Sequence, residues 1–301
     1  MTDIPFVKME GAGNDFIVID RSIFNAPLPP SLLQKLADRR FGVGCDQILC
    51  FKRLQAAESC SDAPRFEYLI FNQDGSEAAQ CGNGARCVGR YIFSHDLADG
   101  SRCIKLCAQH GEIAVMIDDR GLISADMGRA SVAPEDVPFI PAPEGMPPML
   151  SRRTGELEEH LLEVEGISCW YAAVGIGNPH AVVFWNESPL EDAPLEPAAK
   201  RLQASPRFPE GVNVSFVEPP RRLGGEARIR TYERGAGETL ACGTGTSASF
   251  MAGVLRGTFR RDAVQLFRAR GGLLACRILK DGGVGLAGPA REVYSGIFFN
   301  A

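Results

Sequence analysis

The sequence lacks the patterns that would place the chain in a membrane, on nucleic acid or outside the cell. No apolar run approaches the roughly 18 residues of a spanning helix, and no basic segment with an apolar core follows the first residue. The net charge is −5 and no basic run reaches five residues, so nucleic acid is not an expected partner. With 45% hydrophobic and 23% charged residues, we expect a globular protein located in the cytoplasm.

Motifs for cofactors and metals are missing as well. The chain has no Gly-rich dinucleotide fingerprint, and none of its ten cysteines forms a Cys-x2-Cys pair, so we expect no cofactor and no metal site. A disulfide framework is not expected in a chain of 301 residues without a secretion signal. Most of the cysteines are interpreted as small reduced residues in or near the core: Cys50, Cys60, Cys103, Cys107, Cys169 and Cys276.

The other cysteines include a pair that belongs to a repeated motif. In FNQDGSEAAQCGNGARCV, Glu77 precedes Cys81 by four residues, and in YERGAGETLACGTGTSA, Glu238 precedes Cys242 by four. Both cysteines open a Cys-Gly-x-Gly segment, and their offset is 242 − 81 = 161 residues. Two Gly-x-Gly-Asn loops show a similar offset (178 − 14 = 164), so we infer an internal duplication.

Proline content marks a boundary between the two copies. Residues 131–150 contain six prolines, which is typical of an irregular connector. We therefore predict one domain over 1–130, joined by a returning strand at about 290–301, and a second over 131–289. Helices are predicted over 32–41, from 82 to about 95, over 194–203 and after Cys242. The helix after Cys242 should be largely buried, because residues 240–255 include no charged residue, and most other segments alternate like strands.

The two Cys-led helices suggest a chemistry. A helix start carries unpaired N–H groups and about half a positive charge, so we expect the pKa values of Cys81 and Cys242 to be lowered. The same N–H groups can bind a carboxylate. A carboxylate held between two such helix starts would have a sulfur on each side of its α-carbon. One thiolate could then remove the α-proton while the other thiol delivers a proton to the opposite face.

Six segments in order resemble the diaminopimelate epimerase family: FVKMEGAGNDFIVID, FGVGCDQ, FNQDGSEAAQCGNGARC, GNPHAVVF, GVNV and ERGAGETLACGTG. The resemblance runs from residue 6 to residue 246. It implies an α/β (α+β) fold of two pseudo-symmetric domains, each a mostly antiparallel sheet wrapped around a central helix, with the active site in the cleft between the domains. It also implies a pyridoxal-independent isomerase that converts LL- into meso-2,6-diaminopimelate for lysine and peptidoglycan precursors.

The resemblance also assigns roles to residues. Cys81 and Cys242 correspond to the acid/base pair, with His180 and Glu233 setting their protonation, and Arg234 is suited to grip the distal carboxylate. The substrate-binding positions are Asn14, Gln47, Asn72, Gly82, Asn83, Asn178, Asn213, Glu233, Arg234, Gly243 and Thr244. The implied partner is the small-molecule substrate diaminopimelate, and a homodimer remains an open alternative to a monomer. Glu10 and Cys45 depart from the residues common in the family, without removing a functional group.

Two other interpretations compete with this one. A racemase of the proline or hydroxyproline type shares two-cysteine chemistry, and a Cys-rich metal or redox protein would explain the cysteine count. At the residue level, His180 could be an ordinary strand-edge histidine, and Cys87 is interpreted as helix packing. Arg86 and Arg90 share a helix face, which we interpret as solvated and without a role.

Overall fold

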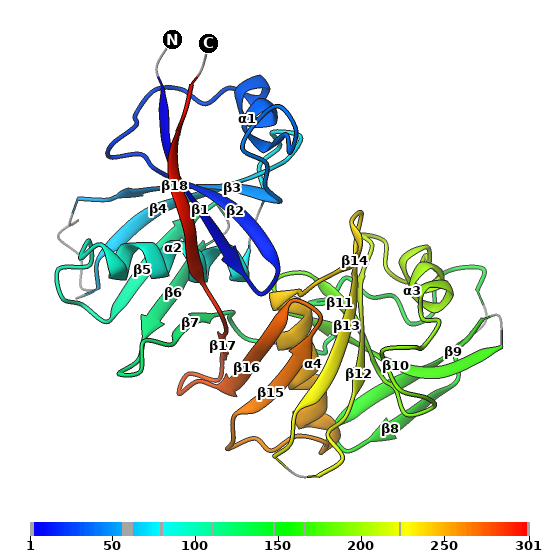
Figure 1. The fold of residues 1–301 in the computed structure, drawn as a ribbon. Helices are drawn as coiled ribbons and strands as arrows, with labels where there is room; N and C mark the ends of the chain where they lie inside the picture. Colours follow the sequence, from blue (N-terminus) through cyan, green and yellow to red (C-terminus); the bar gives the residue numbers. More distant parts are fainter. Residues whose placement is uncertain are drawn as a thin grey trace. The chain divides into compact units, whose positions relative to one another are not determined.

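The computed structural model describes residues 3–55, 63–78, 81–109, 111–146, 148–164, 166–222 and 224–299. The chain divides into two compact units (Figure 1). Unit 1 comprises Met1–Asp126 and Ala287–Ala301, and unit 2 comprises Met127–Leu286. The boundaries expected from the sequence, after residues 130 and 289, lie near these divisions.

Unit 1 is built mainly from strands. Its elements in chain order are β1 (Ile4–Gly11), β2 (Asn14–Asp20), α1 (Pro30–Ala37), β3 (Gln47–Arg53), β4 (Arg65–Asn72), α2 (Gly82–Ser94), β5 (Cys103–Ala108), β6 (Gly111–Ile117), β7 (Ile123–Asp126) and, from the far end of the chain, β18 (Arg291–Phe298). β18 pairs antiparallel with β1, with Ile4 opposite Phe298, which joins the two ends of the chain in one sheet.

Unit 2 is also built mainly from strands, with two helices in its described residues. Its elements are β8 (Ser151–Thr154), β9 (Leu157–Val164), β10 (Ile167–Gly175), β11 (Pro179–Phe184), α3 (Glu196–Gln203), β12 (Asn213–Glu218), β13 (Ala227–Glu233), β14 (Gly237–Thr239), α4 (Gly243–Arg256), β15 (Gln265–Ala269) and β16 (Gly272–Ile278), while β17 (Val284–Ala287) lies at the end of the unit.

The strand pairings of the two units follow the same sequence of directions. In unit 1, β1–β2 is antiparallel, β2–β3 parallel, β3–β4 antiparallel, β4–β5 parallel and β5–β6 antiparallel. In unit 2, the same order holds for β10–β11, β11–β12, β12–β13, β13–β15 and β15–β16. The two repeated halves of a mixed, mostly stranded α/β fold are therefore confirmed.

A central helix fills each unit. Helix α2 packs against β1, β2, β3, β6, β7 and β18, and α4 packs against β9, β10, β11, β12 and β16. Glycines permit this close packing, because a Cβ on Gly89 would lie 2.5 Å from Val115 and one on Gly253 would lie 2.1 Å from the Phe259 ring. Each helix is thus held along its length by the strands around it, which fixes the position of its first turn.

One local expectation differs from the structure. The first helix ends at Ala37, not at residue 41, because the Asp38 carboxylate accepts hydrogen bonds from the N–H groups of Arg40 and Phe41 and turns the chain. Helix α4, in contrast, starts at Gly243, directly after Cys242 as expected, and Leu240 before it is half-exposed. Cys60 and most of the polar segment 52–64 lie outside the described residues. Within the described part of the chain, no helix has the length and apolar character needed to cross a membrane.

Candidate active site

Cys81 is the residue immediately before α2, and its side chain caps the helix. Its backbone is extended (φ −147°, ψ 104°), and its Sγ accepts a hydrogen bond from the N–H of Gly84 at 3.3 Å. This occupies one of the N–H groups that a helix start leaves unpaired. The N–H groups of Gly82 and Asn83, in the first two helical positions, belong to the same turn.

Cys242 stands in the same relation to α4. Its Sγ accepts from the N–H of Gly245, also at 3.3 Å, and lies 3.4 Å from the Thr244 hydroxyl. Gly84 and Gly245 are the third helical residue of each helix, and neither position has room for a side chain. A Cβ at Gly84 would lie 2.7 Å from the Tyr68 hydroxyl, and one at Gly245 would lie 2.8 Å from the Ser215 hydroxyl. Strand residues therefore pack closely against each helix start, at the glycine whose N–H donates to the sulfur.

The electrostatics of Cys242 differ from the sequence-based prediction. Burial raises the pKa of the Cys242 thiol far above its ordinary value, and the neighbouring Glu233 carboxylate raises it further. Hydrogen bonds from the Thr244 hydroxyl and the Gly245 N–H lower it only in part. The expected lowering of this pKa is wrong, because desolvation of a charged sulfur outweighs the field of the helix start. In this state Cys242 is a protonated thiol. For Cys81, which is more exposed, the lowered pKa stays a prediction.

In unit 1, the side chains of two predicted binding residues meet directly. The Asn83 amide nitrogen donates to the Asn14 amide oxygen at 2.6 Å, and the Asn14 nitrogen donates to the Asp46 carboxylate at 3.2 Å. Asn14 opens β2 and Asn83 lies in the first turn of α2. The strand start and the helix start that carries Cys81 are thus joined by an amide pair.

A second pair of amides in unit 1 is set by strand register. Gln47 and Asn72 are opposite each other on β3 and β4, and the Gln47 amide donates to the Asn72 oxygen at 3.1 Å. The Asn72 amide in turn donates to the Ser76 hydroxyl at 3.1 Å. In the pairing of β2 with β3, Gln47 lies opposite Phe16. Phe16 is two residues after Asn14 on β2, so the Gln47–Asn72 amide pair lies near Asn14 in the sheet.

In unit 2, Asn213 and Glu233 occupy the ends of β12 and β13. The Asn213 oxygen accepts from the backbone N–H of Arg234 at 2.9 Å, and its amide donates to the Pro179 carbonyl at 3.4 Å. The Glu233 carboxylate accepts from the Thr239 hydroxyl at 2.6 Å while it lies beside Cys242. The guanidinium of Arg234 donates to the Glu210 carbonyl.

His180 is placed differently from its predicted role. It is fully buried on β11, where its Nε2 is 2.8 Å from the Asn178 amide oxygen, and burial lowers its pKa to about 3. Its Nδ1 has no hydrogen-bond partner among the described residues. A neutral imidazole therefore fixes Asn178, and no described hydrogen bond joins His180 to a cysteine.

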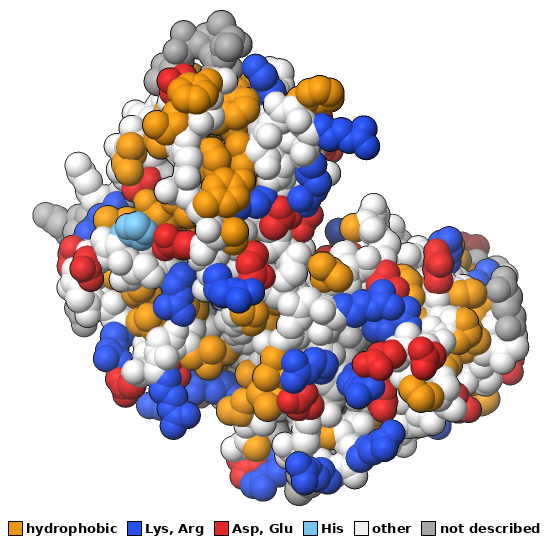
Figure 2. Space-filling view, viewed as in Figure 1, with side chains coloured by type: hydrophobic (Ala, Val, Ile, Leu, Met, Phe, Trp, Pro, Cys, Tyr) orange, Lys and Arg blue, Asp and Glu red, His pale blue; other side chains and the backbone are white. Residues whose placement is uncertain are grey.

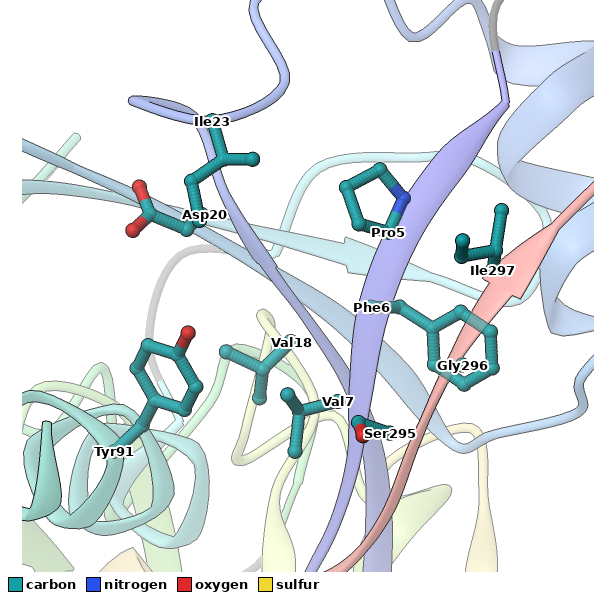
Figure 3. Close-up of a pocket in the computed structure, with 10 residues that line it drawn as sticks. All are labelled: Pro5, Phe6, Val7, Val18, Asp20, Ile23, Tyr91, Ser295, Gly296 and Ile297. Atoms are coloured by element: carbon teal, nitrogen blue, oxygen red, sulfur yellow. The ribbon is translucent and has the colours of Figure 1, made fainter.

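The predicted residues thus gather into two groups, one in each unit. The unit 1 group is Cys81, Gly82, Asn83, Asn14, Gln47 and Asn72, and the unit 2 group is Cys242, Gly243, Thr244, Glu233, Arg234, Asn213, Asn178 and His180. A pocket of about 310 Å³ in unit 1 lies elsewhere (Figure 3). It is lined by β1, β2, β18 and Tyr91, which is near the opposite end of α2 from Cys81.

Two charged residues that were not predicted as site residues lie against the unit 1 group. Arg86, interpreted as solvated, is fully buried and donates to the Asn83 oxygen at 2.8 Å. Asp15 forms ion pairs with Lys8 and Arg39, and although burial alone would raise its pKa, these hydrogen bonds lower it to about 2. Asp15 directly follows Asn14, which is a predicted binding residue, and this adjacency could have indicated Asp15. For Arg86, the available signal was its place between the small residues Ala85 and Cys87, five residues after Cys81.

Among the described residues, no group of three or more His, Cys, Asp or Glu side chains could hold a metal ion. The nine described cysteines are all free thiols.

The family model and the curated relatives that match this chain agree on one family. Residues 6–133 and 172–293 match the family model described as diaminopimelate epimerase. The chain is similar to the diaminopimelate epimerase of Laribacter hongkongensis, with 39% identity over 294 residues that cover 97% of this chain and 98% of the relative. It is 40% identical over 299 residues to that of Acidovorax ebreus, covering 97% of each.

Solved structures with the same fold are more distant in sequence. A predicted epimerase from Pseudomonas aeruginosa superposes with a TM-score of 0.63 at 15% identity, covering 99% of this chain and 100% of that one. A hydroxyproline epimerase from Agrobacterium vitis, with bound trans-4-hydroxy-L-proline, gives 0.60 at 16% identity and covers 98% and 92%. At these identities the likeness concerns the fold.

Proposed function

Because this chain belongs to the diaminopimelate epimerase family and is an isomerase of that activity, we propose that Cys81 and Cys242 are its two acid/base groups. The observation that carries the proposal is the matched capping geometry. Each sulfur accepts from the N–H three residues ahead at 3.3 Å, so each is held at a helix start. In the proposed reaction, one sulfur removes the α-proton of diaminopimelate and the other delivers a proton to the opposite face of the carbon.

The protonation of the pair follows from the surroundings of each sulfur. Cys242 is buried beside Glu233 and is a thiol, so in the proposed resting enzyme Cys242 is the proton donor and Cys81, as thiolate, is the base. When Cys242 has given up its proton and Cys81 has gained one, the enzyme is set for the reverse direction. The Glu233 carboxylate can then receive or return the proton of Cys242, which is its proposed catalytic role.

The α-carboxylate of the substrate has a proposed site at the two helix starts. The backbone N–H groups of Gly82 and Asn83 on α2, and of Gly243 and Thr244 on α4, occupy the first two positions of each helix. Such groups bind anions and stabilise the negative charge that develops when the α-proton leaves. Since each tenfold in rate requires about 1.4 kcal/mol, donors of this kind are needed to compensate for the weak acidity of an α-proton.

The remaining polar groups have a proposed role in substrate orientation. Asn14, Gln47 and Asn72 present amides in unit 1, and Asn178, Asn213 and Arg234 present polar groups in unit 2. We assign Arg234 to the distal carboxylate, which a guanidinium can bind through two parallel N–H donors. His180 is assigned a supporting role through its contact with Asn178.

An isotope experiment tests the reaction. The protein is incubated with LL-diaminopimelate in deuterated water, and the expected result is conversion to the meso isomer with deuterium at one α-carbon. Turnover of proline or hydroxyproline without any reaction of diaminopimelate would instead support the racemase alternative. Bound metal in stoichiometric amount would favour the metal-protein alternative.

Substitution of the two cysteines tests their roles. Cys81→Ser and Cys242→Ser should each abolish turnover while the protein stays folded, and a variant with near-normal turnover would refute the two-base scheme. Cys103→Ser is a matched control, because Cys103 is a free, half-buried thiol on β5 outside both site groups.

For the oligomeric state we propose a homodimer that uses the surface of β18. The side chains of Val293, Tyr294 and Ile297 are 49–57% exposed although they are apolar or aromatic. Figure 2 shows hydrophobic side chains gathered on this part of unit 1, and Figure 3 shows Ile297 beside the pocket of β1. Exposed apolar side chains gathered on one strand are typical of an interface. Light scattering should give twice the chain mass, and Val293→Lys with Ile297→Lys should reduce it to one.

A further inference from the structure

Arg86 is the largest side chain in the described residues that is fully buried, and it lies directly behind the first turn of α2. Its guanidinium donates to the Asn83 amide oxygen at 2.8 Å and to the Gly82 carbonyl at 3.4 Å. Burying a guanidinium is costly unless its contacts recover the lost hydration. An arginine here therefore requires an explanation beyond packing, and these two hydrogen bonds lie in the helix start that carries Cys81.

Arg86 begins a chain of hydrogen bonds in which each side chain donates to the next. Arg86 donates to Asn83, Asn83 donates to Asn14 at 2.6 Å, and Asn14 donates to Asp46 at 3.2 Å. A guanidinium can only donate and an ionised carboxylate can only accept. With a donor fixed at one end and an acceptor at the other, both amides in between have one consistent orientation. The chain of four side chains thus fixes which way Asn83 and Asn14 present their N–H groups.

The other helix offers an internal comparison. Arg86 lies five residues after Cys81, and Ser247 lies five after Cys242. Ser247 donates to the carbonyl of Gly243 at 2.9 Å, which corresponds to the contact of Arg86 with the Gly82 carbonyl. A serine is therefore sufficient to bond this carbonyl. The longer side chain in unit 1 adds the contact with Asn83, for which Ser247 has no counterpart in its described contacts.

We propose that Arg86 is a positioning residue, which holds the amides of Asn83 and Asn14 in the orientation that binds substrate at the Cys81 helix start. The inference rests on the proposed function of Asn14, Asn83 and Cys81. Without the guanidinium, the Asn83 oxygen loses this donor, while the Asn83 amide keeps its hydrogen bond to Asn14. The Asn83 and Asn14 amides are then held less firmly, so substrate binding weakens while the sulfurs remain in place.

Three variants separate positioning from folding. Arg86→Met removes the donors while filling similar space without a buried charge, a change that need not destabilise the protein. Arg86→Lys keeps a donor-only cation of shorter reach. Arg90→Met is the matched control, because Arg90 lies one turn further along α2 and donates to the Gly121 carbonyl, outside the site. The folded fraction of each variant is measured by urea unfolding.

The expected result is a rise in KM for LL-diaminopimelate of about tenfold or more in Arg86→Met, the size of losing a hydrogen bond to a charged group. Arg86→Lys should recover part of the loss, and Arg90→Met should match the wild type. Loss of activity in Arg86→Met only in proportion to the unfolded fraction, with unchanged KM, would overturn the proposal.

A double-mutant cycle gives the decisive comparison. If Arg86 acts through Asn83, Arg86→Met should have little further effect on kcat/KM in an Asn83→Ala background. Full additivity of the two changes would show that Arg86 acts elsewhere and would overturn the inference. The wild type is measured first. If the wild type does not turn over diaminopimelate, the proposed function fails, whereas an active wild type with an additive cycle rejects the role of Arg86 alone.

Discussion

The Glu233 carboxylate lies beside the Cys242 thiol and, second to burial, raises its pKa. A negative charge next to a thiol opposes its ionisation, so this pair keeps the proton on the sulfur at neutral pH. The pKa of Cys242 is therefore raised, whereas a cysteine at a helix start usually has a lowered pKa because the N–H groups favour the thiolate. The Glu233 carboxylate thus adds to burial in keeping Cys242 protonated.

Glu233→Gln should therefore lower the pKa of Cys242. The glutamine removes the charge but keeps the size of the side chain, while burial still holds the pKa above its ordinary value. Alkylation of Cys242, followed by mass spectrometry of its peptide as a function of pH, should reach half its maximal rate at a lower pH than in the wild type. Glu226→Gln, which removes a carboxylate paired with Arg268, serves as the control and should leave the profile unchanged.

His180 predicts a pH dependence of stability. Its pKa is about 3 in the folded protein and about 6.5 when unfolded, so below pH 6.5 the unfolded chain binds a proton that the folded chain does not. Stability should fall as the pH decreases from about 6.5 towards 3, by about 1.4 kcal/mol per pH unit. Urea unfolding at pH 7 and pH 5 should show a smaller difference for His180→Gln than for the wild type. His95→Gln removes an exposed histidine and should behave as the wild type.

The glycines that bond the sulfurs predict a steric effect. Gly245→Ala would place a Cβ 2.8 Å from the Ser215 hydroxyl and 3.2 Å from Thr231, so the first turn of α4 must shift. We expect a loss of about 1–3 kcal/mol in the free energy of unfolding and a larger relative loss of turnover. Ser215→Ala in the same background should restore part of both, because it removes the nearest atom. Normal kcat in Gly245→Ala would show that the position of Cys242 tolerates this shift.

Arg234 predicts a change in substrate affinity. Its side chain passes over Gly211, where a Cβ would lie 2.6 Å from the Arg234 Cδ, and it donates to the Glu210 carbonyl. If its guanidinium binds the distal carboxylate through two donors, Arg234→Lys should raise KM about tenfold with a small change in kcat. Arg228→Lys is the control, because Arg228 lies on β13 and forms a surface ion pair with Glu191. Equal KM values in the two variants would exclude this role.

The helices that carry the cysteines could be predicted from sequence because their signals are local. A Cys-Gly-x-Gly segment followed by a helical run places α2 and α4 to within a few residues, and the repeat offset relates them. The same is true of the amides, since Asn14 and Asn213 follow Gly turns and open strands.

What sequence could not supply is the consequence of packing between distant elements. The raised pKa of Cys242 depends on burial, which no nearby residue indicates. Arg86 was misread because its helical neighbours at one turn's spacing include Arg90, as in a solvated face, while the strands around α2 in fact enclose it. Helical spacing shows which side chains share a face and leaves open what covers that face.

The pairing of β18 with β1 has a consequence for biosynthesis. Unit 2 is one continuous stretch of chain, so it can fold as soon as its residues have emerged from the ribosome. Unit 1 begins to emerge first but cannot complete its sheet, because Ile4 must wait for Phe298. During synthesis, β1 therefore remains without its β18 partner until translation reaches the end of β18.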